Sequence, residues 1–209
     1  MAAFRDPLTL DDVLDANPIV DYLTQPQLAW PTAGVAAIVL CCAEYARRHH
    51  TAPAVSIIAQ AHVSPTLLVG QNLGPFAAVG YDVSVAAARD LYEQAGMGPE
   101  EVGVCELHDS STLSELLLYE ALGLCREGSA EKLVEDGDNT DGGNLVVNPS
   151  GGLLSLGQAA EASSLAQSIE LVHHLRGSAG ARQVAGARIA LQHQISADGT
   201  VTLSLYRRD

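Results

Sequence analysis

Residues 102–124 read VGVCELHDSSTLSELLLYEALGL, and this stretch decides the fold class. Its apolar start, residues 102–107, predicts a buried strand. Residues 113–124 carry apolar side chains at three- and four-residue spacing, which predicts a helix that Ser111 or Thr112 can cap. A strand that runs directly into a helix is the unit of a layered α/β fold.

Strands and helices are predicted to alternate along the rest of the chain as well. Apolar runs predict strands at residues 34–42, 54–61, 188–195 and 200–206. Periodic runs, the second of them with Ser84 as its N-cap, predict helices at residues 44–50, 84–94 and 163–176. Polar, Gly-rich or Pro-rich composition predicts irregular structure at residues 8–30, 62–81 and 125–152. This order predicts an α/β domain with a mixed sheet and helices on both faces.

The composition narrows the classes of partner and ligand. The 209 residues are 47% hydrophobic but only 4% aromatic, which suits buried strands packed against Ala-rich helices. The formal net charge of −14 argues against nucleic acid as a partner and supplies no long-range attraction for a polyanion such as coenzyme A. The longest apolar run, residues 34–43, is too short to cross a bilayer, so no membrane span is expected.

The cysteines form no C-x-x-C pair and have no zinc-site spacing with a histidine, so we expect no bound metal. They are Cys41, Cys42, Cys105 and Cys125. Free thiols indicate an intracellular protein. Residues 1–15 lack the apolar core of a signal peptide, and residues 206–209 are not a peroxisomal S-K-L signal. The expected location is therefore cytoplasmic or peroxisomal.

Two stretches are candidates for a functional site. His108 and Asp109 follow a predicted strand, at the edge where open α/β sheets bind ligands. The alternative is that this pair only caps the next helix. Residues 148–158 read NPSGGLLSLGQ, and such glycines let the backbone approach a ligand closely. They meet no Walker or dinucleotide spacing, so the alternative is an ordinary loop.

Four stretches resemble the thiolase branch of the sterol carrier protein X family, of the propanoyl-CoA C-acyltransferase type. They are ELHD at 106–109, SELLLYEALGLC at 114–125, VNPSGGLLS at 147–155 and ALQH at 190–193. The resemblance extends from about residue 8 to residue 206. It implies the layered C-terminal domain of a thiolase-like fold.

The resemblance also implies a two-step reaction in which a Cys thiolate passes an acyl group to coenzyme A. In the family that Cys lies in the N-terminal half of the fold, and no cysteine here matches its motif. We therefore expect residues 1–52 to be a remnant of the N-terminal half and residues 53–209 to be the C-terminal domain. The chain alone is expected not to catalyse thiolysis.

The family's site residues are altered at several matching positions. His108 keeps the family's active-site His, while Ser110 stands at the acid/base Cys, and a hydroxyl is a far weaker acid than a thiol. Gln158 stands at the His of the Gly-His-Pro loop, where losing an oxyanion donor costs about 100- to 1000-fold in rate. His193 matches a further active-site position. Ser155 and Gly157 match the coenzyme A side.

The resemblance leaves three functions open. The first is an acyltransferase that is active only when a partner supplies the cysteine half. The second is a non-catalytic subunit that binds acyl-CoA or lipid or acts as a scaffold. The third is a decayed gene product. A coenzyme A thioester is the expected ligand, with no other cofactor. The helix at 163–176 is sandwiched between the two halves of the family's fold. Its outer side is therefore expected to lack a partner here and to favour an N-terminal-half protein or a homo-oligomer.

Overall fold

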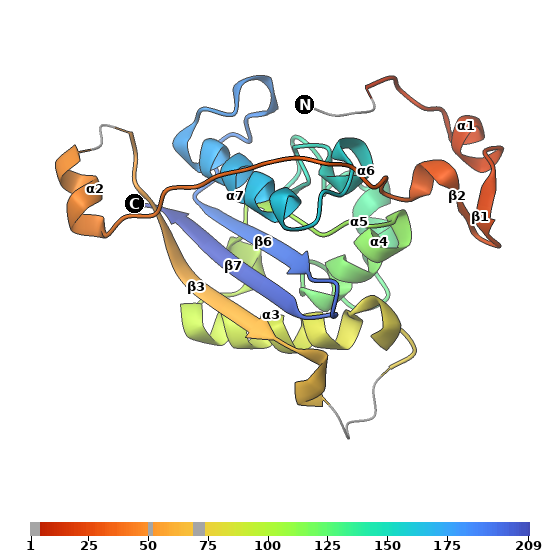
Figure 1. The fold of residues 1–209 in the computed structure, drawn as a ribbon, viewed down its shortest axis with the longest axis horizontal. Helices are drawn as coiled ribbons and strands as arrows, with labels where there is room; N and C mark the ends of the chain where they lie inside the picture. Colours follow the sequence, from red (N-terminus) through yellow and green to blue (C-terminus); the bar gives the residue numbers. More distant parts are fainter. Residues whose placement is uncertain (1–4, 50–51, 69–73) are drawn as a thin grey trace.

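A five-stranded mixed sheet forms the centre of the computed structural model, which describes residues 5–49, 52–68 and 74–209 (Figure 1). The strands, in their order across the sheet, are β3 (Val55–Val63), β7 (Val201–Arg208), β6 (Ile189–Ile195), β4 (Val104–Glu106) and β5 (Val146–Val147). Neighbours are antiparallel from β3 to β6 and parallel from β6 to β5. The predicted mixed sheet is confirmed.

Helices cover both faces of this sheet, as predicted. On one face α3 (Tyr81–Ala95) and α4 (Thr112–Ala121) enclose the larger core, whose fully buried residues include Leu91, Leu107 and Leu203. On the other face α7 (Glu161–Arg176) packs its buried Leu171 and Leu175 against a second core. Burying a Leu side chain stabilises a fold by about 1.5–3 kcal/mol, so these two layers hold the domain together.

Short elements complete the fold outside the main layers, and the one at 43–49 confirms the helix predicted at 44–50 over its described residues. The α-helices and strands are α1 (Leu10–Leu14), β1 (Pro18–Val20), β2 (Leu23–Thr24), α2 (Ala43–His49), α5 (Ala130–Glu135) and α6 (Gly152–Leu156). Single 3₁₀ turns lie at Gln25–Gln27, Pro65–Leu68, Ala77–Val79, Pro99–Glu101 and Gly180–Arg182. Apart from the helix at 43–49, these elements carry too few residues to show a periodic pattern. Of the predicted loop at 62–81 and the helix at 44–50, residues 69–73 and His50 lie outside the described residues.

The predicted N-cap of the second helix is wrong, whereas one of the two candidates for α4 is confirmed. Gly80, at φ 79°, precedes the first residue of α3, and Ser84 is buried inside that helix, where its Oγ donates to the Gly80 carbonyl at 2.8 Å. Ser111 caps α4, because its Oγ accepts the backbone N–H of Ser114 at 3.0 Å.

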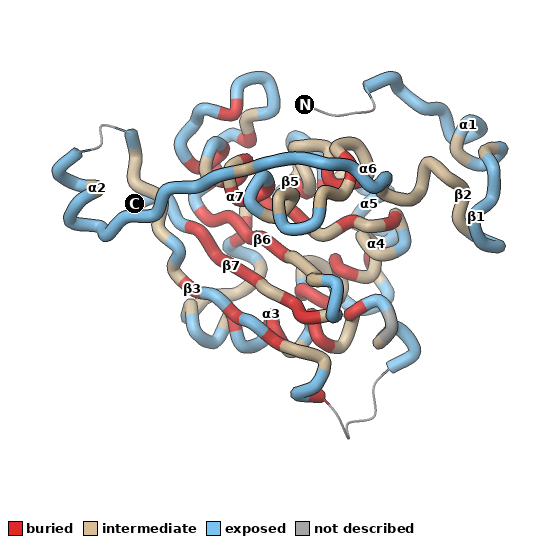
Figure 2. The backbone as a smooth tube through the Cα atoms, in the orientation of Figure 1, coloured by how far each residue is buried: buried red, intermediate tan, exposed pale blue. Residues whose placement is uncertain are grey.

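The predicted buried strand at residues 34–42 is wrong. This stretch, named here the apolar segment, belongs to no strand ladder of the described chain, and Figure 1 shows it extended, crossing in front of α7. Its Val35 and Val39 are 98% and 92% exposed, and Figure 2 colours the stretch almost entirely as exposed. The apolar pattern of a strand is present, but no described strand lies beside it to complete a sheet.

The outer side of α7 is less apolar than a sandwiched helix would suggest. Its exposed residues include Glu161, His173 and Arg176, and Leu165, at 39%, is the only large hydrophobic residue of α7 that is exposed. The exposed apolar surface that was expected on the outer side of α7 is therefore found on the apolar segment. The division of the chain at residues 52 and 53 stays a prediction.

Candidate functional site

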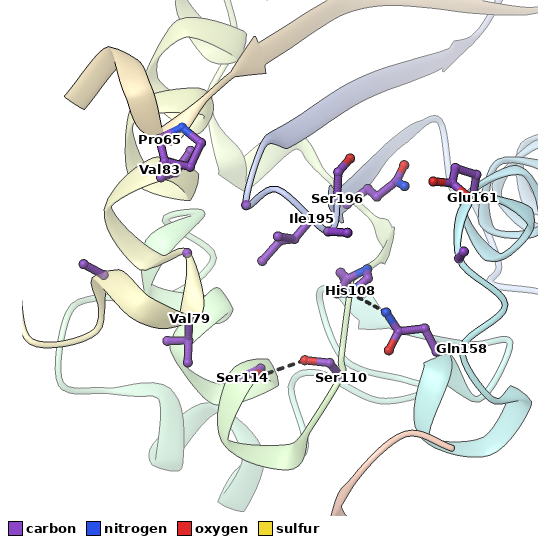
Figure 3. Close-up of a pocket in the computed structure, with 16 residues that line it drawn as sticks. Pro65, Val79, Val83, His108, Ser110, Ser114, Gln158, Glu161, Ile195 and Ser196 are labelled. Carbon is purple, nitrogen blue, oxygen red and sulfur yellow. Dashed lines mark hydrogen bonds between the residues drawn. The ribbon is translucent and has the colours of Figure 1, made fainter. Parts of the chain in front are cut away.

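A cavity of about 360 Å³ opens beyond the carboxyl end of β4, where sequence reasoning places a site (Figure 3). His108, Ser110 and Gln158 line it, which brings together three of the predicted site residues; it is named here the His108–Gln158 cavity. The other lining residues include Val79, Gly80, Val83, Ser114, Ala160, Glu161, Ile195 and Ser196. The wall is therefore apolar on the side of α3 and polar on the side of β4.

His108 and Gln158 contact each other through their side chains. Gln158 Nε2 lies 3.3 Å from His108 Nε2, the contact drawn as a dashed line in Figure 3. An amide nitrogen only donates, so His108 Nε2 accepts and the ring carries its proton on Nδ1. Burial lowers the pKa of His108 to about 4, so the ring is neutral at pH 7. The basic nitrogen of His108, Nε2, therefore already accepts a hydrogen bond from Gln158, and the Nδ1–H group is left as a donor.

His193 is fully buried on β6 and holds the backbone of His108 rather than lining the cavity. Its Nδ1 accepts the backbone N–H of His108 at 3.4 Å, and its Nε2 then donates to Ser84 Oγ at 3.1 Å. Burial, and then the nearby His108, lower the pKa of His193 to about 3. A neutral imidazole held between two partners positions the turn after β4.

Asp109 builds the turn that presents Gln158. Its carboxylate accepts the backbone N–H groups of Leu153 at 2.7 Å and Leu154 at 3.3 Å, at the start of α6. Gly152 sits at φ 63°, and a Cβ there would lie 2.1 Å from Asp109 Oδ2. Burial raises the pKa of Asp109 to about 7 despite these bonds. Asp109 is thus a capping residue for α6, whereas its neighbour His108 lines the cavity.

A second buried acidic side chain fixes the start of the same turn. Glu106 accepts the backbone N–H of Ser150 at 3.0 Å and its hydroxyl at 2.7 Å. The Asn148 side-chain carbonyl accepts the Leu107 N–H at 2.7 Å, which binds the turn to the end of β4. Burial raises the pKa of Glu106 to about 8. The glycine-rich stretch is therefore rigidly held against the sheet.

The hydroxyls in the cavity lack a base. Ser110 Oγ lies 3.4 Å from Ser114 Oγ, which in turn lies 2.8 Å from Ser111 Oγ. No carboxylate, imidazole or amine is bonded to Ser110 in the described part of the chain. A serine needs such a base to act as a nucleophile. Sequence reasoning missed Ser114, although its four-residue spacing from Ser110 on a helix start was a usable signal.

Two further predicted residues lie away from the cavity wall. Ser155 and Gly157 are not among the residues that line the cavity, and Gly157 packs so closely on Thr32 that a Cβ would lie 2.8 Å from that side chain. The coenzyme A contacts predicted for them stay predictions. Ala160, which does line the cavity, holds φ 44° and ψ −130°, a strained backbone at the first turn of α7.

Metal ligands and nucleophilic thiols do not gather here. No group of three or more His, Cys, Asp or Glu residues in the described ranges could hold a metal ion. Cys105 is buried and burial raises its pKa, while Cys41 and Cys42 are exposed on the apolar segment, outside the cavity lining. Among the described helices none is both long and apolar enough to cross a membrane.

Comparisons with known proteins show which family the chain resembles. The family model described as thiolase C-terminal domain-like matches residues 77–204. Sterol carrier protein 2 of Bos taurus is 46% identical over 98% of this chain and 38% of its own length. Acetyl-CoA acetyltransferase of Methanothermobacter thermautotrophicus is 33% identical over 99% of this chain and 53% of its own length.

A solved structure extends the likeness to the fold. The structure titled Ltp2-ChsH2(DUF35) aldolase superposes with a TM-score of 0.77 at 24% identity, over 97% of this chain and 52% of that one. The chain thus spans between about two fifths and about half of the proteins it matches.

Proposed function

Because the chain belongs to the thiolase C-terminal domain-like family, we propose that it binds the thioester carbonyl of an acyl-coenzyme A in the His108–Gln158 cavity and does not cleave it alone. The observation that carries the proposal is the His108–Gln158 pair on the cavity wall. The second hydrogen of the Gln158 amide and the His108 Nδ1–H are neutral donors in a sheltered setting. Such donors stabilise a polarised carbonyl oxygen strongly.

The same pair supports the absence of thiolysis. Thiolysis requires a thiolate nucleophile and a group that takes up a proton. His108 is neutral, with its basic nitrogen bonded to Gln158, and Ser110 has no base among the described residues. Gln158 itself donates hydrogen bonds but does not titrate. The cavity is therefore equipped to bind and orient a thioester rather than to break it.

A second candidate function is acyl transfer by a composite site. It is favoured by the match to an acetyl-CoA acetyltransferase of which this chain covers only 53%. In this case another polypeptide supplies the nucleophile, and the His108–Gln158 cavity supplies the carbonyl donors. The lipid-related relatives are consistent with either candidate, since both use the same cavity.

Titration calorimetry with acetyl-CoA, together with a thiolysis assay on acetoacetyl-CoA, tests the proposal. We expect saturable binding of acetyl-CoA and no thiolysis by the purified chain. Turnover by a variant in which all four cysteines are replaced would show that the chemistry is misjudged, and absence of binding would refute the ligand. Thiolysis that appears only after addition of a cysteine-bearing half would favour the composite site.

A further inference from the structure

Glu161 is the residue of the cavity wall that carries a charge which the proposed binding does not use. It is exposed at the start of α7, and within the described chain its side chain has no ion pair. Figure 3 draws Glu161 with Gln158 on one side of the cavity, across from Val79 and Val83. Because an exposed carboxylate is ionised at pH 7, Glu161 gives this wall a negative charge.

The described lining residues supply no compensating positive charge. Among them only His108 and Glu161 titrate near neutral pH, and there is no Lys or Arg. Burial lowers the pKa of His108 to about 4, so its ring is neutral at pH 7. Polar groups such as Ser196 and Gln194 are neutral, so they donate to a carboxylate without offsetting its charge. A carboxylate that enters the cavity would therefore lose its water without gaining a cation, which is costly.

The N-terminus of α7 does not supply the missing positive charge. A helix N-terminus usually attracts anions through its dipole and its free N–H groups. Here Ala160, at φ 44° and ψ −130°, folds the chain into a tight turn. The N–H groups of Ala162 and Ser163 donate within this turn, at 3.1 Å and 3.2 Å, to the carbonyls of residues 159 and 160. Glu161 adds its carboxylate at the same end, where it offsets the positive charge of the dipole.

We propose that Glu161 is a specificity-determining residue, which makes the His108–Gln158 cavity reject acyl groups that carry a carboxylate and accept neutral ones. The proposal rests on the proposed function, for which it names the class of acyl group. It holds for either direction in which the acyl chain leaves the His108–Gln158 pair. A carboxylate on the side of Val79 and Val83 meets an apolar wall, and one on the side of Glu161 meets a like charge.

Glutaryl-CoA and pentanoyl-CoA form the test pair, because their acyl chains have the same carbon number and only the first ends in a carboxylate. Both carry the same coenzyme A phosphates, so the ratio of their dissociation constants cancels the repulsion of those phosphates by the net charge. By titration calorimetry at pH 7, we expect the unmodified chain to bind glutaryl-CoA at least about tenfold more weakly. Raising the salt from about 0.1 M to about 1 M should reduce the ratio, since salt screens charge repulsion.

Replacing Glu161 separates its charge from its size. Glu161→Gln keeps the shape of the side chain and should reduce the ratio by about three- to fivefold, whereas Glu161→Lys should reduce it further. Glu161→Asp keeps the charge and should keep most of the discrimination. Glu131→Gln is the matched control, because Glu131 is also an exposed acid in the first turn of a helix, α5, and lies outside the cavity lining. It should leave the ratio unchanged.

The possible outcomes separate this proposal from the proposed function. Equal binding of both ligands by the unmodified chain would overturn the specificity and leave the proposed function intact. A ratio that Glu161→Gln and Glu161→Lys leave unchanged would do the same, because the discrimination would then not come from this charge. An equal effect of Glu131→Gln would assign the discrimination to the net charge instead. Absence of pentanoyl-CoA binding by the unmodified chain would refute the proposed function, and the specificity with it.

Discussion

At the residue scale, Gln158 is the side chain on which the proposed binding depends most. Replacing it by Ala removes one hydrogen-bond donor to the thioester and frees His108 Nε2. We expect acetyl-CoA binding to weaken by about 3- to 10-fold, the effect of one hydrogen bond. Titration calorimetry measures it. Gln60→Ala is the matched control, because Gln60 lies on the edge strand β3, outside the cavity lining, and its loss should not alter binding.

Glu106 provides a pH prediction at the same scale. Burial raises its pKa to about 8, so the folded protein holds a proton that the unfolded chain, with a Glu pKa near 4.5, has already released. Stability from this group is present at low pH and is lost as the pH rises towards 8. Asp109, with a pKa of about 7, acts in the same direction. His108 and His193 have lowered pKa values, so they destabilise the folded protein only as the pH falls below their ordinary pKa of 6.5. Above that pH they do not change the trend set by the two acids.

We therefore expect the melting temperature to fall between pH 6.5 and pH 8, the window set by these pKa values. Glu106→Gln keeps the shape and the acceptor for Ser150 N–H but does not titrate, so its melting temperature should fall less over that window. Differential scanning calorimetry of both proteins across the window is the measurement. An equal fall in both would mean that Glu106 is not protonated in the folded state.

At the element scale, α6 begins with a glycine that the site requires. Gly152 and Gly96 both have positive φ, at 63° and 66°, but a Cβ on Gly152 meets Asp109 at 2.1 Å whereas one on Gly96 meets nothing within 4 Å. Gly96→Ala should cost only the backbone strain of about 1–2 kcal/mol. Gly152→Ala should cost at least about 1 kcal/mol more, because the Asp109 contacts must shift. Urea unfolding of both variants measures the difference, and equal losses would contradict it.

The elements also show what the sequence predicts well. The longest ones, such as α3, α7 and β3, follow their periodic or apolar patterns. The five-residue α6 was missed, because Asp109, more than 40 residues away, stabilises it through hydrogen bonds. The apolar segment was wrongly assigned to a sheet, because a strand's partner cannot be read from the strand itself.

The site, like the helices and strands, was predicted in part. The edge of the sheet and its two main side chains, His108 and Gln158, were expected, and the structure brings them into contact. The buried residues that hold these two side chains in place were not predicted. Ser84 contacts His193 across 109 positions of the chain, and it was interpreted as a helix cap because its local sequence fits one. Contacts of this range follow from the packing of α3 on the sheet and not from any motif.

At the scale of the whole molecule, the net charge of −14 predicts an unusual salt dependence. A coenzyme A thioester is a polyanion and is repelled, and salt screens that repulsion because the Debye length falls from about 10 Å at 0.1 M to about 3 Å at 1 M. Binding of acetyl-CoA should tighten as salt is raised. An uncharged thioester, S-acetyl-N-acetylcysteamine, should show no such change. Weaker acetyl-CoA binding in salt would indicate basic contacts to the phosphates instead.

The His108–Gln158 cavity is proposed to hold an acyl thioester by its carbonyl and to leave it intact. Carbon-13 NMR of acetyl-CoA labelled at the thioester carbonyl tests both parts at once. With saturating protein, we expect a downfield shift of the carbonyl signal that Gln158→Ala reduces, and no product signal with time. A carbonyl signal that stays at its free position in the bound state would refute binding by the carbonyl, and one that converts to another acyl species would refute the absence of cleavage.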